Sequence, residues 1–114
     1  MRKIELEVLE AIRNKTNLSS GNTVVVVSDA GNIQVLLHGS SIVRIEDNEK
    51  KIFVSLAGFN TTVTRGRINL VMNKYGVSRV VNKGNTPEIG GHPIKTRGWY
   101  QVTRNGIEIE PIAE

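Results

Sequence analysis

The chain has 114 residues, enough to bury one hydrophobic core but few for two, so we expect a single compact domain over residues 1–114. It has no cysteine, which excludes disulfides, thiolate catalysis and Cys-ligated zinc, and its aromatic content of 4% predicts an aliphatic core. No apolar run approaches the roughly 20 residues that span a bilayer. The N-terminal MRKIELEVLE alternates charges where a signal peptide is apolar, so we expect a cytoplasmic protein with no membrane partner.

The first predicted element is an amphipathic helix over residues 2–13. Its apolar residues recur on one helical face, namely Ile4, Val8, Ala11 and Ile12. We expect the helix to end near residues 14–17, before the turn residues SSGN.

Four predicted strands follow from Thr23. The segments TVVVVSD, IQVLLH, SIVRIE and KIFVSL are rich in β-branched residues and are separated by short turn-like sequences. Such short links favour hairpins, so an antiparallel meander is the expected topology. The four successive valines at 24–27 predict a strand that is buried on both faces or central in the sheet.

A second helix is predicted over residues 63–75, with threonines suited to its N-cap and Gly76 placed to terminate it. Its expected core face holds Ile68, Val71, Met72 and Tyr75. The opposite side forms an expected outer stripe that mixes apolar and basic residues: Val63, Gly66, Arg67, Leu70, Asn73 and Lys74.

Residues 77–82 and 99–103 are predicted strands, and 107–109 a further short one. The Gly- and Pro-containing segment 84–98 between them is expected to be a mobile loop. The predicted fold class is therefore α+β, with an antiparallel β-meander of about 4–6 strands packed against the N-terminal helix and a second helix near 63–75.

No catalytic or metal-binding signature is present. His38 and His92 are the only histidines, and their places in the sequence do not form a metal-binding pair. No Gly-x-Ser-x-Gly elbow or phosphate-binding loop occurs. We therefore expect a protein that is not an enzyme and has no catalytic residues, metal or cofactor.

The net charge of +4 is unevenly distributed along the chain. Residues 1–64 hold seven basic and seven acidic residues and sum to zero. Residues 65–104 hold eight basic residues against Glu88 alone, a sum of +7. These eight are Arg65, Arg67, Lys74, Arg79, Lys83, Lys95, Arg97 and Arg104. Such a block is either a solvated surface or the site that contacts a polyanionic partner.

Part of the sequence resembles small, mostly uncharacterised bacteriophage proteins. The stretch LAGFNTTVTRGRIN over residues 56–69 is similar to a Gly-Trp-x-Thr segment that leads into a Thr-x-Ser-Arg-Leu-Asn helix, with Phe59 at the position of the tryptophan. SGNT at 20–23 and LHG at 37–39 match two further motifs. The resemblance implies a phage protein that acts inside the infected host cell.

Two residues of the matching helix point in different directions. Arg67 and Asn69 are separated by about 200° on a regular helix, so both cannot face one ligand. We expect Arg67 on the outer stripe and Asn69 beside the core, bonded to a nearby loop.

The first functional hypothesis is a nucleic-acid-binding module, in which the eight basic residues contact phosphates and Trp99 or Tyr100 stacks on a base. The alternative is a protein-interaction module that inhibits or redirects a host enzyme or defence system. It would bind an acidic host protein, or a second copy of itself as a homodimer, through Val63, Gly66 and Leu70. A third possibility is an anion ligand at the start of the second helix, beside Thr61, Thr62 and Thr64.

Overall fold

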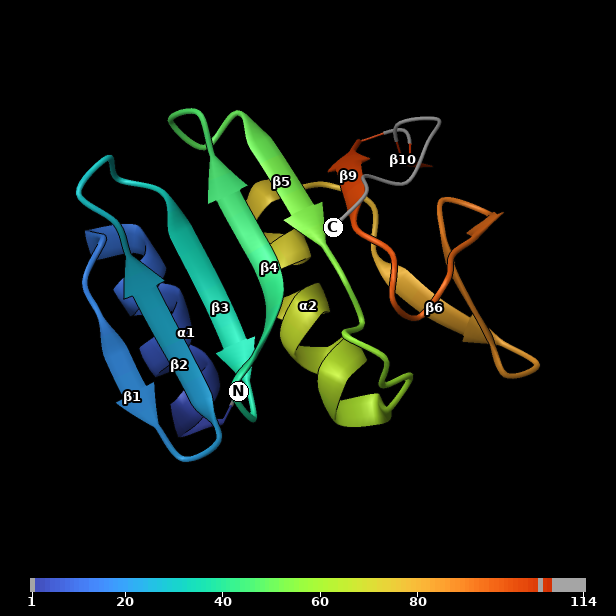
Figure 1. Ribbon diagram of the computed structural model, residues 1–114, viewed down its shortest axis with the longest axis horizontal. Coiled ribbons are helices and arrows are strands. Elements are labelled where there is room, and N and C mark those ends of the chain that lie inside the picture. The colour runs from blue at the N-terminus through green and yellow to red at the C-terminus, as the bar shows by residue number, and fades with distance from the viewer. Residues whose placement is uncertain (1, 105, 108–114) are drawn as a thin grey trace.

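Two helices and a seven-stranded antiparallel sheet form the body of the chain in a computed structural model, which describes residues 2–104 and 106–107 (Figure 1). The strand order of this sheet is β1-β2-β3-β4-β5-β9-β10, and β6, β7 and β8 form a separate three-stranded sheet. The helices are α1 (Lys3–Asn14) and α2 (Thr62–Tyr75). The strands are β1 (Leu18–Ser20), β2 (Thr23–Val27), β3 (Ile33–Leu37), β4 (Ser40–Glu46), β5 (Lys51–Val54), β6 (Val80–Lys83), β7 (Thr86–Ile89), β8 (His92–Pro93), β9 (Tyr100–Thr103) and β10 (Gly106–Ile107). The predicted α+β fold is confirmed.

Helix α1 is held at both ends by local hydrogen bonds. The backbone N–H of Arg2 donates to Glu5 Oε1 at 2.8 Å, so this N–H, which precedes the first turn, has a hydrogen-bond partner. Lys15 takes the left-handed conformation after the last turn, as is common at helix C-termini. Val8, Ala11 and Ile12 are buried, so the face predicted from the periodicity packs on the sheet.

Strands β2 to β5 form the predicted meander. Consecutive strands pair antiparallel, and the register places Val25 opposite Val35, Val35 opposite Val43, and Val43 opposite Val54. Because neighbouring side chains alternate between the two faces of a sheet, these residues all point toward the helices. They are fully buried and form the centre of the core.

The two helices cover one face of the sheet, and the other face is open toward the viewer in Figure 1. The predicted burial of both faces at residues 24–27 is therefore wrong for Val26, which is exposed on the open face. Strand β1 was not expected, because its sequence LSS lacks an apolar alternation. It is held at the sheet edge by backbone pairing with β2.

Helix α2 has the predicted caps. Thr61 is the N-cap, and its hydroxyl accepts a hydrogen bond from the backbone N–H of Thr64 at 3.1 Å. Gly76 ends the helix with φ of 67°, a conformation that favours glycine.

The segment 84–98 contains β7 and β8 where the sequence predicted a loop. Strand β7 pairs with both β6 and β8, and Ile89 and Ile94 are buried against the core. The segment is therefore folded into the small sheet at the side of the molecule (Figure 1). Its expected mobility stays a prediction.

Candidate functional site

Three turns meet at one end of the molecule, around the start of α2. The backbone N–H of His38 donates to the carbonyl oxygen of Asn22 at 2.8 Å, and the His38 ring lies 3.4 Å from the Asn22 amide nitrogen. Arg67 Nε donates to Thr23 Oγ1 at 3.2 Å, and Thr23 is fully buried. We call this surface, formed by residues 20–23, 37–40 and 57–67, the loop end. It brings together the segments that resemble phage motifs.

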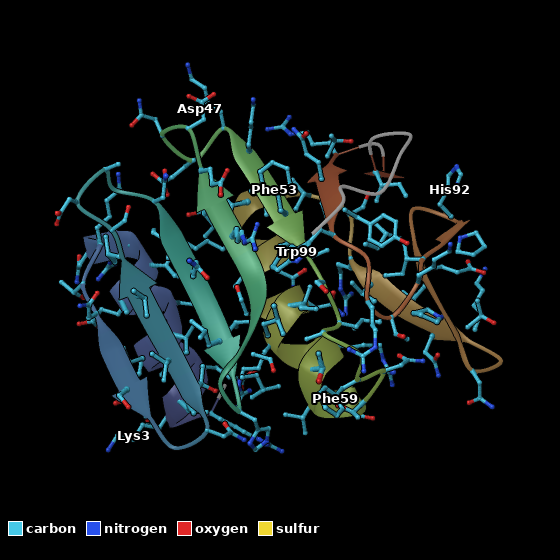
Figure 2. All side chains as sticks on the ribbon, in the orientation of Figure 1. Lys3, Asp47, Phe53, Phe59, His92 and Trp99 are labelled. Atoms are coloured by element: carbon cyan, nitrogen blue, oxygen red, sulfur yellow. The ribbon has the colours of Figure 1, made fainter. Side chains whose placement is uncertain are left out.

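An apolar pocket of about 390 Å³ lies at the loop end. Its floor is formed by Leu37, Ile42 and Leu56, all buried. Phe59 and Val63 stand at its rim and are 58% and 48% exposed. Figure 2 shows Phe59 beside the first turn of α2, away from the main body of the sheet. Large apolar side chains so exposed beside an apolar pocket are typical of an interaction surface.

The loop end carries positive charge, because residues 20–23, 37–40 and 57–67 include Arg65 and Arg67 and no acidic residue. The first turn of α2 carries no acidic residue, so nothing within that turn offsets the partial positive charge of the helix N-terminus. Arg67 and Arg2 line a second hollow of about 300 Å³ beside Val63, together with Glu5. An anionic group is therefore favoured next to the apolar pocket.

The predicted basic residues do not share one surface. Arg65 donates to Asn60 Oδ1, and Asn60 in turn donates to Asn82 on β6 at 3.0 Å. Arg67 instead reaches β2 through Thr23, on the side of α2 that faces α1. The others are exposed, namely Lys74, Arg79, Lys83, Lys95, Arg97 and Arg104.

Lys74 lies at the far end of α2 from Arg67, beside a groove of about 560 Å³ between the two helices. Its ammonium group lies 5.3 Å from the ring centroid of Tyr75. Burial, together with a hydrogen bond that the Tyr75 hydroxyl donates to Glu49, raises the pKa of Tyr75 above its ordinary value. These contacts are local to the end of the helix.

The predicted outer stripe of α2 is wrong at Leu70, which is not exposed. Only 8% of Leu70 is exposed, because α1 packs beside α2 and Leu70 lies in the groove between them with Leu6 and Leu9. Val63 and Gly66 are exposed as expected. The helical wheel placed Leu70 on the correct side of α2. A projection of α2 alone, however, does not include the neighbouring helix α1.

Replacing Gly66 with alanine is expected to raise the free energy of unfolding by about 0.5–1 kcal/mol. Gly66 lies within α2, and an added Cβ would meet no atom within 4 Å, so alanine gains helix propensity without a clash. Urea unfolding followed by circular dichroism measures the change. An unchanged or lower midpoint would contradict the open surroundings of Gly66.

Trp99 and Arg44 form a stacked pair on the open face of the sheet. The Arg44 guanidinium carbon lies 4.2 Å from the centroid of the Trp99 ring, and Trp99 is only 4% exposed. Tyr100 points to the opposite side and is buried in the core. Trp99 is thus covered by Arg44 rather than presented to solvent as a bare stacking surface.

A family model described as Kyanoviridae Gp96 protein matches residues 1–106 of the chain. The chain belongs to this family. It is a phage protein, as the resemblance implied. No curated protein and no solved structure matches it.

The two histidines of the chain lie far apart in the sequence and on different elements. His38 lies at the loop end, whereas His92 lies on the small sheet at the side of the molecule (Figure 2). Within residues 2–104 and 106–107, no three histidine or carboxylate side chains gather as a metal site would require. In the same part of the chain, no helix combines the length and apolar character needed to cross a membrane.

Proposed function

We propose that this phage protein is a non-enzymatic accessory protein that binds an acidic partner protein at the loop end. The observation that supports the proposal is the apolar pocket with Phe59 and Val63 exposed at its rim. A partner that covers these side chains removes their apolar surface from water, which favours binding. The proposed partner is a host enzyme or defence protein that the phage inhibits or redirects.

The charge of the loop end supports an acidic partner. Arg67 and the N-terminus of α2 lie next to Val63, so a partner with an apolar side chain flanked by carboxylates would match both features. Complementary charge of this kind speeds association and selects against basic proteins.

The test is affinity purification of the tagged protein from infected cells, with two variants in parallel. Phe59→Ser combined with Val63→Ser removes the exposed apolar rim. Val81→Ser is the matched control, because Val81 is 42% exposed on β6, outside the loop end. We expect an acidic partner with the wild type and the control, and at least about 30-fold weaker binding of that purified partner by the double variant.

Two results would overturn the proposal. Retention of the partner by the double variant would place the interface elsewhere. A wild-type dimer that becomes a monomer in the double variant, measured by light scattering, would assign the pocket to a second copy of the chain.

Nucleic-acid binding is a second candidate function, and one observation favours it. Arg97, one of the residues predicted from the sequence, lines a hollow on the open face of the sheet together with Arg44. Two guanidinium groups at one hollow match the chemistry of a phosphate.

A further inference from the structure

A buried threonine holds the guanidinium of Arg67 in place at the loop end. Arg67 Nε donates to Thr23 Oγ1 at 3.2 Å, and Thr23 Oγ1 donates its own hydrogen to Asn22 Oδ1 at 3.0 Å. The Thr23 side chain is fully buried, so its hydroxyl cannot turn toward water. Because that hydroxyl has only one hydrogen and donates it to Asn22, its lone pairs face Arg67. The direction of the Arg67 side chain is therefore set from within the fold.

The terminal amino groups of Arg67 are available to a ligand. Nε is the atom that bonds to Thr23, and within residues 2–104 and 106–107 Arg67 forms no other hydrogen bond and no ion pair. A guanidinium bonded through Nε still presents Nη1 and Nη2, whose N–H groups match the two oxygens of a carboxylate. Arg67 is partly exposed, so these groups can reach a molecule outside the chain.

The hollow beside Arg67 carries one positive charge in excess. Its lining contains Arg2, Glu5, Thr62, Val63, Gly66 and Arg67. Glu5 Oε1 accepts the backbone N–H of Arg2, and in the described part of the chain no ion pair joins the Glu5 carboxylate to either arginine. Both helices begin at this end of the molecule (Figure 1), and the first turn of α2 contains no acidic residue, so the positive end of its dipole adds to the excess. A singly charged anion such as a carboxylate is therefore the group that best balances the hollow.

Gly66 keeps the hollow open. An added Cβ at Gly66 would meet no atom within 4 Å, and its φ lies outside the left-handed region, so the fold itself does not require glycine at this position. Glycine inside a helix is also less favourable than alanine. The absence of a side chain instead leaves room for another molecule to approach α2 beside Arg67.

The hollow and the apolar pocket lie side by side on the same helix. Val63 lines both of them. Gly66 and Arg67 follow Val63 by three and four residues, so the three positions lie on one face of α2. A partner segment that places an apolar side chain in the pocket therefore brings its neighbouring residues to the hollow.

We propose that Arg67 binds an aspartate or glutamate side chain of the partner protein, next to the apolar side chain that enters the pocket. Thr23 is the positioning residue that holds Arg67 in the binding orientation, although Thr23 itself is buried and touches no partner. The inference rests on the proposed function at the loop end and adds the chemistry of the segment that is recognised.

The first test selects peptides from a displayed library of random sequences on the immobilised protein. The wild type is expected to select peptides that share an apolar residue and, at a fixed spacing from it, an aspartate or glutamate. Arg67→Gln should select peptides that keep the apolar residue and lose the acidic one. Phe59→Ser combined with Val63→Ser should lose the apolar residue, because it removes the rim of the pocket.

The selections separate failure of this inference from failure of the proposed function. Wild-type peptides without an acidic position, or an acidic position that Arg67→Gln retains, would overturn the role of Arg67 and leave the apolar pocket as a binding site. Identical peptides from the wild type and from the variant with both serines would overturn the proposed function itself. Selection of no peptide by the folded wild type would overturn both.

The second test uses fluorescence anisotropy to measure the affinity of one selected peptide and of its neutral analogue, which has the amide in place of the acidic side chain. Arg67→Gln should weaken binding of the acidic peptide about 10-fold and leave the neutral analogue unchanged. Thr23→Val loses the hydroxyl and should weaken the acidic peptide about 5-fold, whereas Thr23→Ser keeps the hydroxyl and should change it less than about 2-fold. Arg13→Gln is the matched control and should have no effect, because Arg13 is an exposed arginine in the last turn of α1, far along that helix from Glu5.

A double-variant cycle shows whether Thr23 acts through Arg67. Thr23→Val added to Arg67→Gln should cause no further loss, because the hydroxyl then has no guanidinium to hold. If Thr23→Val weakens the acidic peptide and the neutral analogue equally, the fold is disturbed in general and Thr23 is not a positioning residue.

Gly66→Met tests the open space without a loss of stability. Methionine forms helices better than glycine and extends a side chain toward the hollow, so binding of the acidic peptide should fall about 10-fold while the midpoint of urea unfolding does not fall. Unchanged binding would show that the partner does not approach α2 at Gly66, contrary to the proposal.

A peptide with phosphoserine at the acidic position tests the charge of the ligand. It should bind more weakly than the acidic peptide, because Glu5 repels the second negative charge. Tighter binding of the phosphopeptide would overturn the assignment of a carboxylate and place a phosphate in the hollow.

Discussion

Trp99→Ala is expected to lower the free energy of unfolding by about 3–5 kcal/mol, the range for removal of a large buried aromatic side chain. Trp99 is 4% exposed, and the truncation leaves a cavity beneath Arg44 that the rigid sheet cannot close. The guanidinium of Arg44 also loses the ring on which it stacks. Urea unfolding followed by circular dichroism measures the effect, because the variant has no tryptophan fluorescence.

Phe59→Ala is the matched control for this variant. Phe59 is an aromatic residue of similar size, but 58% of it is exposed at the loop end, so its truncation should change stability by no more than about 0.5 kcal/mol. Trp99→Phe should lie between the two, since it keeps a ring in the site. Equal losses in Trp99→Ala and Phe59→Ala would contradict the different burial of the two rings.

Asn69→Ala is expected to lower the free energy of unfolding by about 2–4 kcal/mol. The Asn69 side chain forms two hydrogen bonds with the backbone of Val80: Oδ1 accepts from the Val80 N–H at 2.7 Å, and Nδ2 donates to the Val80 carbonyl at 2.8 Å. Val80 is buried at the start of β6, so alanine leaves both backbone groups without a partner or water.

Two further variants separate this effect from a general loss in α2. Asn73→Ala changes the same residue type at an exposed position of the same helix and should leave the midpoint of urea unfolding nearly unchanged. Asn69→Asp keeps the acceptor and loses the donor, so its loss should be a large part of that of Asn69→Ala. A small effect of Asn69→Ala would show that β6 is held in place without this pair of bonds.

The local patterns of the sequence predicted most of the main sheet and both helices. The alternation in residues 23–54 and the caps at Thr61 and Gly76 depend on neighbours in the sequence, and the structure confirms them. Asn69 was expected to bond a nearby loop, and it does bond a segment close in sequence, but its partner Val80 belongs to strand β6. Strands β7 and β8 were missed because they are short, each contains a proline and glycines flank them, and they are held by backbone pairing.

The candidate site was harder to predict, because it depends on contacts between distant segments. The alternation in SIVRIE could have shown that Arg44 points away from Val43 and Ile45, but not that Trp99 lies beneath it. Similarly, no pattern near Leu70 indicates that α1 packs beside it. The charge count places eight of the fifteen basic residues in residues 65–104, but it could not indicate that Arg65 and Arg67 bond to different elements on different sides of α2.

The order of strands in the main sheet has a consequence for how the chain folds. Each of strands β1 to β4 pairs with the next strand in sequence, so these contacts close only short loops. Strand β9 pairs with β5 only after α2 and the small sheet have been placed between them, as the pairing of Val54 with Tyr100 shows. Closing a long loop costs more chain entropy, so we expect the β5–β9 pairing to form late in folding. The surface that holds Arg44 and Trp99 together would then exist only once folding is nearly complete.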